Sequence, residues 1–179
     1  IIDSAYDPTV AVLKNELWVS FECAGLHFPG TASCMGPMTG EVGDWELDLD
    51  RTQLVVAGTQ SVAASVPKIF SFLTRNYMWF DYFRTSHPGY IEARGIELLQ
   101  DGQGRFWAMG KNGTMSVEDP SAITVWQPSG SDGGVADVFG IDVEDKELII
   151  TAGIGPLSCD EPSAPVKGCY RVAVARTNF

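Results

Sequence analysis

The chain has 179 residues, of which 45% are hydrophobic and 20% are charged, and its formal net charge is −11. This composition can build a buried core and excludes intrinsic disorder, and no apolar run reaches the roughly 18 residues that a membrane-spanning helix needs. A surface this acidic repels phosphate groups, so we expect neither a nucleic acid nor a membrane among its partners.

Short β-rich segments separated by polar turns follow one another along the chain. In order they are 10–12, 17–21, 54–57, 68–72, 77–80, 96–99, 106–109, 141–143, 148–151 and 170–175. No window keeps an apolar stripe of helical period over three turns, and glycine and proline are scattered throughout. The sequence therefore predicts an all-β, antiparallel fold.

Five hairpins share one spacing, in which an apolar residue of the first strand is followed seven or eight residues later by a bulky pair. The bulky pairs begin at Leu17, Leu54, Tyr77, Phe106 and Leu148. Repeated hairpins with heavy second strands are typical of β-propeller blades, because a hairpin buries both faces only between neighbours. An ordinary antiparallel meander has similar spacing, so a β-sandwich or jelly roll is the alternative.

The number of blades is harder to predict, because a blade takes about 40–50 residues. The gaps between successive hairpin origins are 37, 22, 29 and 43 residues, and two of them are too short for a four-stranded blade. We therefore expect a single all-β domain over residues 1–179 that is an incomplete or short-bladed propeller. It is either part of a longer propeller, or a partner chain or a missing segment completes its ring.

Four cysteines form two close pairs, Cys23 with Cys34 and Cys159 with Cys169, and each pair brackets loop sequence containing glycine and proline. We favour two loop-closing disulfides among the three possible connectivities, which predicts a secreted, extracellular or periplasmic protein. The chain opens at Ile1 without a signal-peptide pattern, so either a leader has been removed or the chain is a fragment. No CxxC spacing occurs, and we expect no metal and no other cofactor.

Four segments of the chain resemble the five-bladed β-propeller glycoside hydrolases, the superfamily that includes family 43 and the arabinanases. Residues 6–10 (YDPTV) with 17–21 (LWVSF) resemble the opening blade, in which Asp-Pro precedes an aromatic-rich strand. Residues 65–70 with 76–80 resemble the second blade, and 94–98 with 104–107 resemble the third. Residues 170–177 are similar to the edge strands of that superfamily.

The resemblance implies a carbohydrate ligand and inverting, metal-independent hydrolysis of a glycosidic bond. That chemistry uses a general base and a general acid, and the family adds a third carboxylate that tunes the acid. Asp7 matches the base, but Val66 and Arg94 occupy the second and third positions, and neither is a carboxylate. Whether the chain is an enzyme therefore stays open. The alternative is a non-catalytic carbohydrate- or protein-binding module on the same scaffold.

Two nearby carboxylates are candidates for the acid or its modulator. Glu92 lies two residues before Arg94 and would share its face of a strand, while Asp81 interrupts the aromatic run 77–83. Arg94 would then hold substrate hydroxyls. Glu22 ends an apolar strand, where most glutamates are solvated, although its position beside a cysteine leaves a site role open.

The aromatic residues divide into two groups. Trp18, Trp79 and Trp107 recur at matching repeat positions, so we expect them in the core between blades. Trp126 and Tyr90 fall outside that repeat and lie next to Gly/Pro-containing loops, which makes them the candidates for stacking on a sugar ring.

Overall fold

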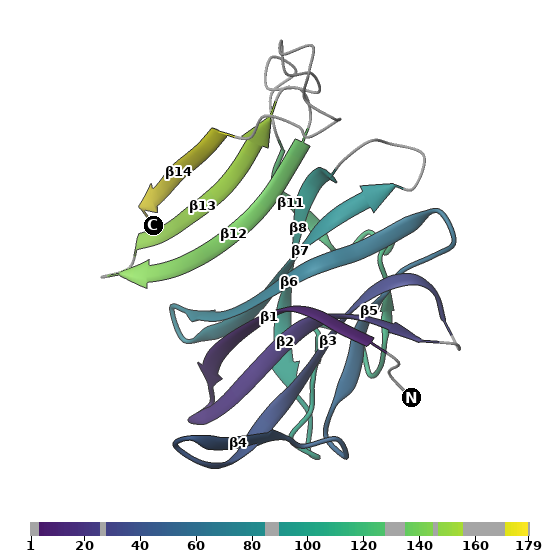
Figure 1. Cartoon of the computed structure of the whole chain (residues 1–179), viewed down its shortest axis with the longest axis vertical. Coiled ribbons are helices and arrows are strands. Elements are labelled where there is room, and N and C mark those ends of the chain that lie inside the picture. Colours follow the sequence, from purple (N-terminus) through teal and green to yellow (C-terminus); the bar gives the residue numbers. More distant parts are fainter. Residues whose placement is uncertain are drawn as a thin grey trace.

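The computed structural model describes residues 4–25, 28–84, 90–127, 135–144, 147–155 and 171–178. Every regular element in these ranges is a strand, which confirms the all-β prediction. The same ranges contain no helix long and apolar enough to cross a membrane. The strands form three sheets, with the second sheet placed between the other two (Figure 1).

The first sheet has the strand order β1–β2–β3–β5–β10, and β4 also pairs with β3. Lys14 and Asn15 connect β1 to β2 with φ values of 50° and 65°, which suits a two-residue hairpin turn. A disulfide between Cys23 and Cys34 joins β2 to β3, as the sequence predicted. The strands are β1 (Ser4–Leu13), β2 (Glu16–Gly25), β3 (Phe28–Glu41), β4 (Asp44–Leu47), β5 (Gln53–Ala57) and β10 (Met115–Ser116).

The second sheet has the order β11–β8–β7–β6, with β9 paired to β8, and the third has the order β12–β13–β14. The described pairs are antiparallel except for β5 with β10. The strands of the second sheet are β6 (Val62–Phe72), β7 (Arg75–Arg84), β8 (Tyr90–Gln100), β9 (Phe106–Ala108) and β11 (Ile123–Trp126). Those of the third are β12 (Val135–Glu144), β13 (Glu147–Gly155) and β14 (Arg171–Asn178).

The hairpin predicted from Leu47 to Leu54 is wrong. Both β4 and β5 pair with β3 and not with each other. Between them, the Asp48 carboxylate accepts hydrogen bonds from the backbone N–H groups of Asp50 and Arg51, and its carbonyl accepts one from the Thr52 hydroxyl. This local loop turns the chain back toward β3. The hairpin-like spacing of β4 and β5 therefore arises because each of the two strands pairs separately with β3.

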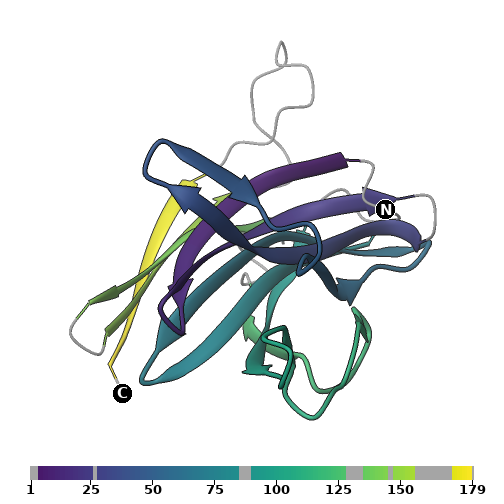
Figure 2. The same cartoon turned by 90° about the horizontal axis from the view of Figure 1, so that it is seen from below.

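Apolar side chains fill the spaces between the sheets. β6 contacts β1, β2 and β3 on one side and β12 on the other, and Figure 2 shows this layering from below. Between the first two sheets, Trp18 meets Phe106 edge-to-face, with ring centroids 4.9 Å apart. Between the second and third, Phe70 and Trp79 pack with Leu148. The three described sheets stack face to face without closing a ring, which agrees with an incomplete propeller and equally with the alternative of a β-sandwich.

Candidate functional site

Two matching β-bulges lie on the first strands of the first two sheets. The register of β1 with β2 breaks between Tyr6 and Thr9, and the register of β6 with β7 breaks between Ser65 and Lys68. The residues left over are Asp7-Pro8 in β1 and Val66-Pro67 in β6. The structure thus gives these two X-Pro pairs equivalent positions, as the sequence predicted.

The backbone has the same unusual conformation in both bulges, with φ of 50° at Asp7 and 48° at Val66. Aspartate tolerates the left-handed region because its short side chain can bond locally, whereas a β-branched valine there is a genuine outlier that costs about 1–2 kcal/mol. Strain of this kind persists where the surrounding structure imposes it, and it often marks a functional site. The Val66 bulge is therefore a reason to examine its surroundings.

Side chains of β2 hold the two bulges together. The Ser20 hydroxyl donates to the Pro67 carbonyl at 2.9 Å and approaches the Thr9 carbonyl at 3.5 Å. The Glu22 carboxylate accepts a hydrogen bond from the Val66 backbone N–H at 3.2 Å. We call Asp7, Ser20, Glu22 and Val66-Pro67 the bulge site.

Asp7 lies within the first bulge, and two further carboxylates lie opposite the residues just before the two bulges. Asp7 is exposed, and Glu22 is half-buried opposite Tyr6. Asp81 is only 1% exposed and lies opposite Ser65, the residue just before the second bulge. Glu22 and Asp81 thus occupy equivalent places on β2 and β7. From the sequence, a solvated Glu22 is the expected interpretation and a site role stays open. Glu22 lies opposite Tyr6, the residue just before Asp7-Pro8, and this position is the signal that could have revealed a site role.

Asp81 shares a face of the second sheet with Trp79, because alternate residues of a strand point to the same side. Lys68, which is also buried, lies opposite Trp79 and therefore on this face too. A buried carboxylate and a buried ammonium thus flank the Val66-Pro67 bulge. Burial of charged groups is costly unless the surroundings compensate it, so two buried charged residues on an otherwise apolar face are a specific feature.

The third sheet has a register break of the same kind, between Val138 and Gly140 of β12. This strand, and not the segment at Arg94, is the first strand of the third sheet. Arg94 lies on β8, inside the second sheet, so the prediction that residues 94–98 open a third blade is wrong. The hairpin from residue 98 to 106 exists, but it belongs to the outer part of the second sheet.

Glu92 and Arg94 bind each other. The Arg94 Nε donates to Glu92 Oε1 at 2.6 Å, and its Nη1 donates to the Val117 carbonyl at 3.2 Å. The second Glu92 oxygen accepts a hydrogen bond from the Thr124 hydroxyl at 3.1 Å. The Arg94 guanidinium also lies over the Tyr82 ring, 3.8 Å from its centroid. These contacts tie β8 to its neighbours, and none of them involves a residue of the bulge site.

The other predicted residues lie apart from the bulges. Trp126 is half-buried and packs against the apolar cluster between the second and third sheets. Tyr90 begins β8. The predicted core position of Trp107 is not borne out, because it is half-exposed and its indole donates to Asp101 at 2.9 Å. Cys159, Cys169 and both histidines lie outside the described residues.

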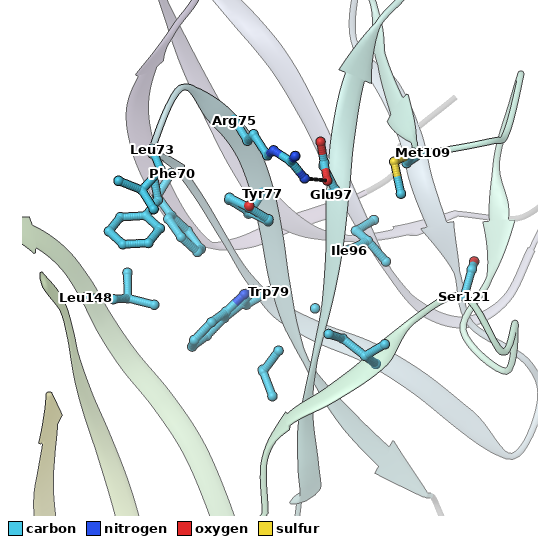
Figure 3. Close-up of a pocket in the computed structure, with 14 residues that line it drawn as sticks. Phe70, Leu73, Arg75, Tyr77, Trp79, Ile96, Glu97, Met109, Ser121 and Leu148 are labelled. Atoms are coloured by element: carbon cyan, nitrogen blue, oxygen red, sulfur yellow. Dashed lines mark hydrogen bonds and ion pairs between the residues drawn. The ribbon is translucent and has the colours of Figure 1, made fainter. Parts of the chain in front are cut away.

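A cavity of about 700 Å³ opens between β6–β8, β11 and β13. Figure 3 shows Phe70, Tyr77 and Trp79 on one wall, with the rings of Phe70 and Tyr77 stacked at 5.5 Å. At its edge, Arg75 binds Glu97 at 3.0 Å. No three His, Cys, Asp or Glu residues within the described ranges gather closely enough to hold a metal ion.

The sequence matches no protein-family model and no curated protein. The structure is similar to the crystal structure of an alpha-L-arabinofuranosidase from Lactobacillus brevis, with a TM-score of 0.53 and 10% sequence identity. The match covers 96% of this chain and 49% of that chain, so this chain spans about half the length of the similar structure. At this identity the similarity shows the fold alone, and that fold is found in a glycosidase.

Proposed function

We propose that this chain binds a carbohydrate at the bulge site. The observation that carries the proposal is the pair of equivalent bulges at Asp7 and Val66, joined through Ser20 and Glu22. The similarity to an arabinofuranosidase fold supports it, because it makes a sugar the first ligand class to test. Fold similarity by itself is an analogy, so the proposal depends on these residues.

Asp7 is the residue that would contact the sugar first. Its side chain is exposed, and an ionised carboxylate accepts hydrogen bonds from hydroxyl groups at both oxygens. Glu22 is half-buried beside Asp7 and already accepts one hydrogen bond from the Val66 backbone N–H. It would form the bottom of the binding site. Because the bulge fixes the backbone at Asp7, little conformational entropy would be lost when a ligand binds there.

Hydrolysis is a second candidate, favoured by the presence of more than one carboxylate near the bulges. Asp7 would act as the general base, in line with the family resemblance. A general acid must reach the leaving oxygen, so the half-buried Glu22 suits this role better than Asp81, which is 1% exposed. Asp81 would serve as the modulator. Glu92 would serve as acid only if it leaves its bonds to Arg94 and Thr124.

Binding and turnover are tested separately. Calorimetric titration with L-arabinose and xylose measures binding, and release of nitrophenol from 4-nitrophenyl α-L-arabinofuranoside measures hydrolysis. We expect saturable binding that Asp7→Asn and Glu22→Gln weaken and that Asp50→Asn, an exposed matched control in the loop before β5, leaves unchanged. Binding that is absent, or that Asp7→Asn does not alter, contradicts the proposal. Sugar binding without release of nitrophenol would show that the chain is a non-catalytic binding module.

We also propose an extracellular location, because the Cys23–Cys34 disulfide is stable mainly in an oxidising compartment. Intact mass under reducing and non-reducing conditions, measured on protein from the native host, tests this. A host protein that is fully reduced when isolated in the presence of a thiol-blocking reagent would contradict it.

A further inference from the structure

The cavity between the second and third sheets is separate from the bulge site, because no residue of that site lines it. Its volume of about 700 Å³ falls within the range of about 300–1,000 Å³ that is typical of small-molecule sites. Of the 14 described residues that line it, only Arg75, Glu97 and Ser121 carry a charge or an aliphatic hydroxyl. The others are apolar or aromatic residues and one glycine, so the cavity offers apolar surroundings to a ligand.

Aromatic rings form the wall of this cavity on β6 and β7. Tyr77 pairs with Phe70 of β6 on one side and with Glu97 of β8 on the other. The Phe70 ring stacks on Tyr77 and also meets the Trp79 ring edge-to-face, with centroids 5.4 Å apart. A Cβ atom at Gly95 would come within 2.9 Å of Trp79 Nε1, so the glycine lets the indole lie against β8. The wall therefore presents rings in two orientations, and both suit contact with a flat ring.

The turn between β6 and β7 places an apolar side chain at the mouth of the cavity. Leu73 and Thr74 form this turn with φ values of 46° and 70°, close to those of Lys14 and Asn15 in the turn between β1 and β2. Asparagine and glycine suit this left-handed conformation, whereas a bulky leucine in it is an outlier. Leu73 nevertheless lines the cavity and is 49% exposed. Strain of this kind is often found at ligand contacts.

Two further exposed apolar residues border the cavity. Met109, just after β9, is 54% exposed, and Ile123, at the start of β11, is 64% exposed. Figure 3 shows Leu73 and Met109 on opposite sides of the Arg75–Glu97 pair. Single exposed apolar residues are common on protein surfaces, but a group of them around a cavity marks a binding site.

We propose that this cavity binds an uncharged, flat, apolar small molecule, such as one with fused aromatic rings. The charges at the edge of the cavity favour an uncharged ligand. Arg75 binds Glu97 at 3.0 Å, so the two opposite charges of the lining compensate each other. A charged ligand would have to separate this pair or leave its own charge without a partner, and both are costly. An O–H or N–H group of an uncharged ligand can still donate to Glu97.

Titration of the full chain with N-phenyl-1-naphthylamine, an uncharged probe whose fluorescence rises in apolar surroundings, tests the proposal. We expect saturable binding of one probe per chain, with energy transfer from tryptophan, because Trp79 forms part of the wall. The anionic analogue 8-anilinonaphthalene-1-sulfonate should bind at least about tenfold more weakly, because its charge has no partner in the cavity. Equal or tighter binding of the anionic probe would overturn the assignment of an uncharged ligand.

Variants in the two equivalent turns separate a ligand contact from a structural role. Leu73→Asn removes the apolar side chain but suits the left-handed backbone, so we expect a Kd that is about three- to tenfold higher without a lower unfolding temperature. Lys14→Asn makes the same change in the other turn, which does not line the cavity, and should leave the Kd unchanged. Ile123→Asp, at the opposite edge, should weaken binding as well.

Three results would overturn the proposal. They are the absence of saturable binding, a Leu73→Asn variant that binds the probe like wild type, and loss of binding in Leu49→Asp. Leu49 borders a different cavity, of about 490 Å³, beside the first sheet. Asp7→Asn should not alter probe binding, so failure of this proposal and failure of carbohydrate binding are distinguishable.

Discussion

The carboxylate of Glu22 accepts a hydrogen bond from the backbone N–H of Val66, 44 positions further along the chain, at 3.2 Å. This contact crosses from the first sheet to the second at the strained bulge of β6. It satisfies a backbone donor that lies within the break in the β6–β7 register, and Glu22 itself lies opposite Tyr6, the residue before Asp7.

Glu22→Ala should destabilise the fold, because it leaves the Val66 N–H without its acceptor. The expected loss is about 1–3 kcal/mol in the free energy of unfolding, measured by urea denaturation. Glu22→Gln keeps an acceptor oxygen and should lose less than half as much. Equal losses for the two variants would show that this hydrogen bond does not hold the bulge.

Glu92→Ala tests whether Glu92 has a structural role. It would leave the largely buried Arg94 guanidinium without its partner at 2.6 Å, so we expect a loss of about 2–3 kcal/mol in unfolding free energy. Carbohydrate binding should be unchanged once the variant is compared at a temperature where it is fully folded. If the Glu92→Ala variant instead loses carbohydrate binding at full stability, Glu92 belongs to the binding site.

The Cys23–Cys34 disulfide should contribute about 2–4 kcal/mol, because it restricts the unfolded chain. The double variant Cys23→Ala/Cys34→Ala, compared with wild type in urea under oxidising conditions, measures this contribution while Cys159 and Cys169 stay unchanged. An unfolding midpoint equal to that of wild type would contradict the prediction.

Phe106→Ala should be the most damaging of these changes, because Phe106 is fully buried and packs edge-to-face on Trp18 between two sheets. Removing an aromatic ring from such a position costs about 3–5 kcal/mol. Leu99→Ala, at the half-exposed neighbouring position of β8, is the control and should change the stability by less than about 1 kcal/mol. Thermal unfolding followed by tryptophan fluorescence compares the two.

Acid should weaken the β8–β9 turn through Asp101. The backbone N–H of Arg105 and the indole of Trp107 lower the pKa of Asp101 to about 2, from 3.8. Because the folded-state pKa lies below the unfolded value, this contribution is present above about pH 4 and is lost as the pH falls toward 2. Asp101→Asn should therefore lose stability relative to wild type at pH 5, and the difference should shrink by pH 2. Urea midpoints across that range measure it, and a difference that does not change with pH would contradict the assignment.

Local sequence determined most of the hairpins. The turns at Lys14-Asn15 and between β6 and β7, and the strand pairs β8–β9 and β12–β13, follow from apolar alternation on both sides of a short polar connection. The equivalence of Asp7-Pro8 and Val66-Pro67 was also predictable, because proline breaks strand pairing at the same point of each repeat.

The sequence by itself thus predicted an all-β chain of repeated hairpins and favoured a disulfide between Cys23 and Cys34, and the structure confirms both. Only the tertiary structure decided which strand pairs with β3, which strand opens the third sheet, and that Glu22 rather than Arg94 lies beside the bulges. These facts depend on contacts between residues far apart in the chain. Such contacts are selected by packing of whole sheet faces, and no local spacing encodes them.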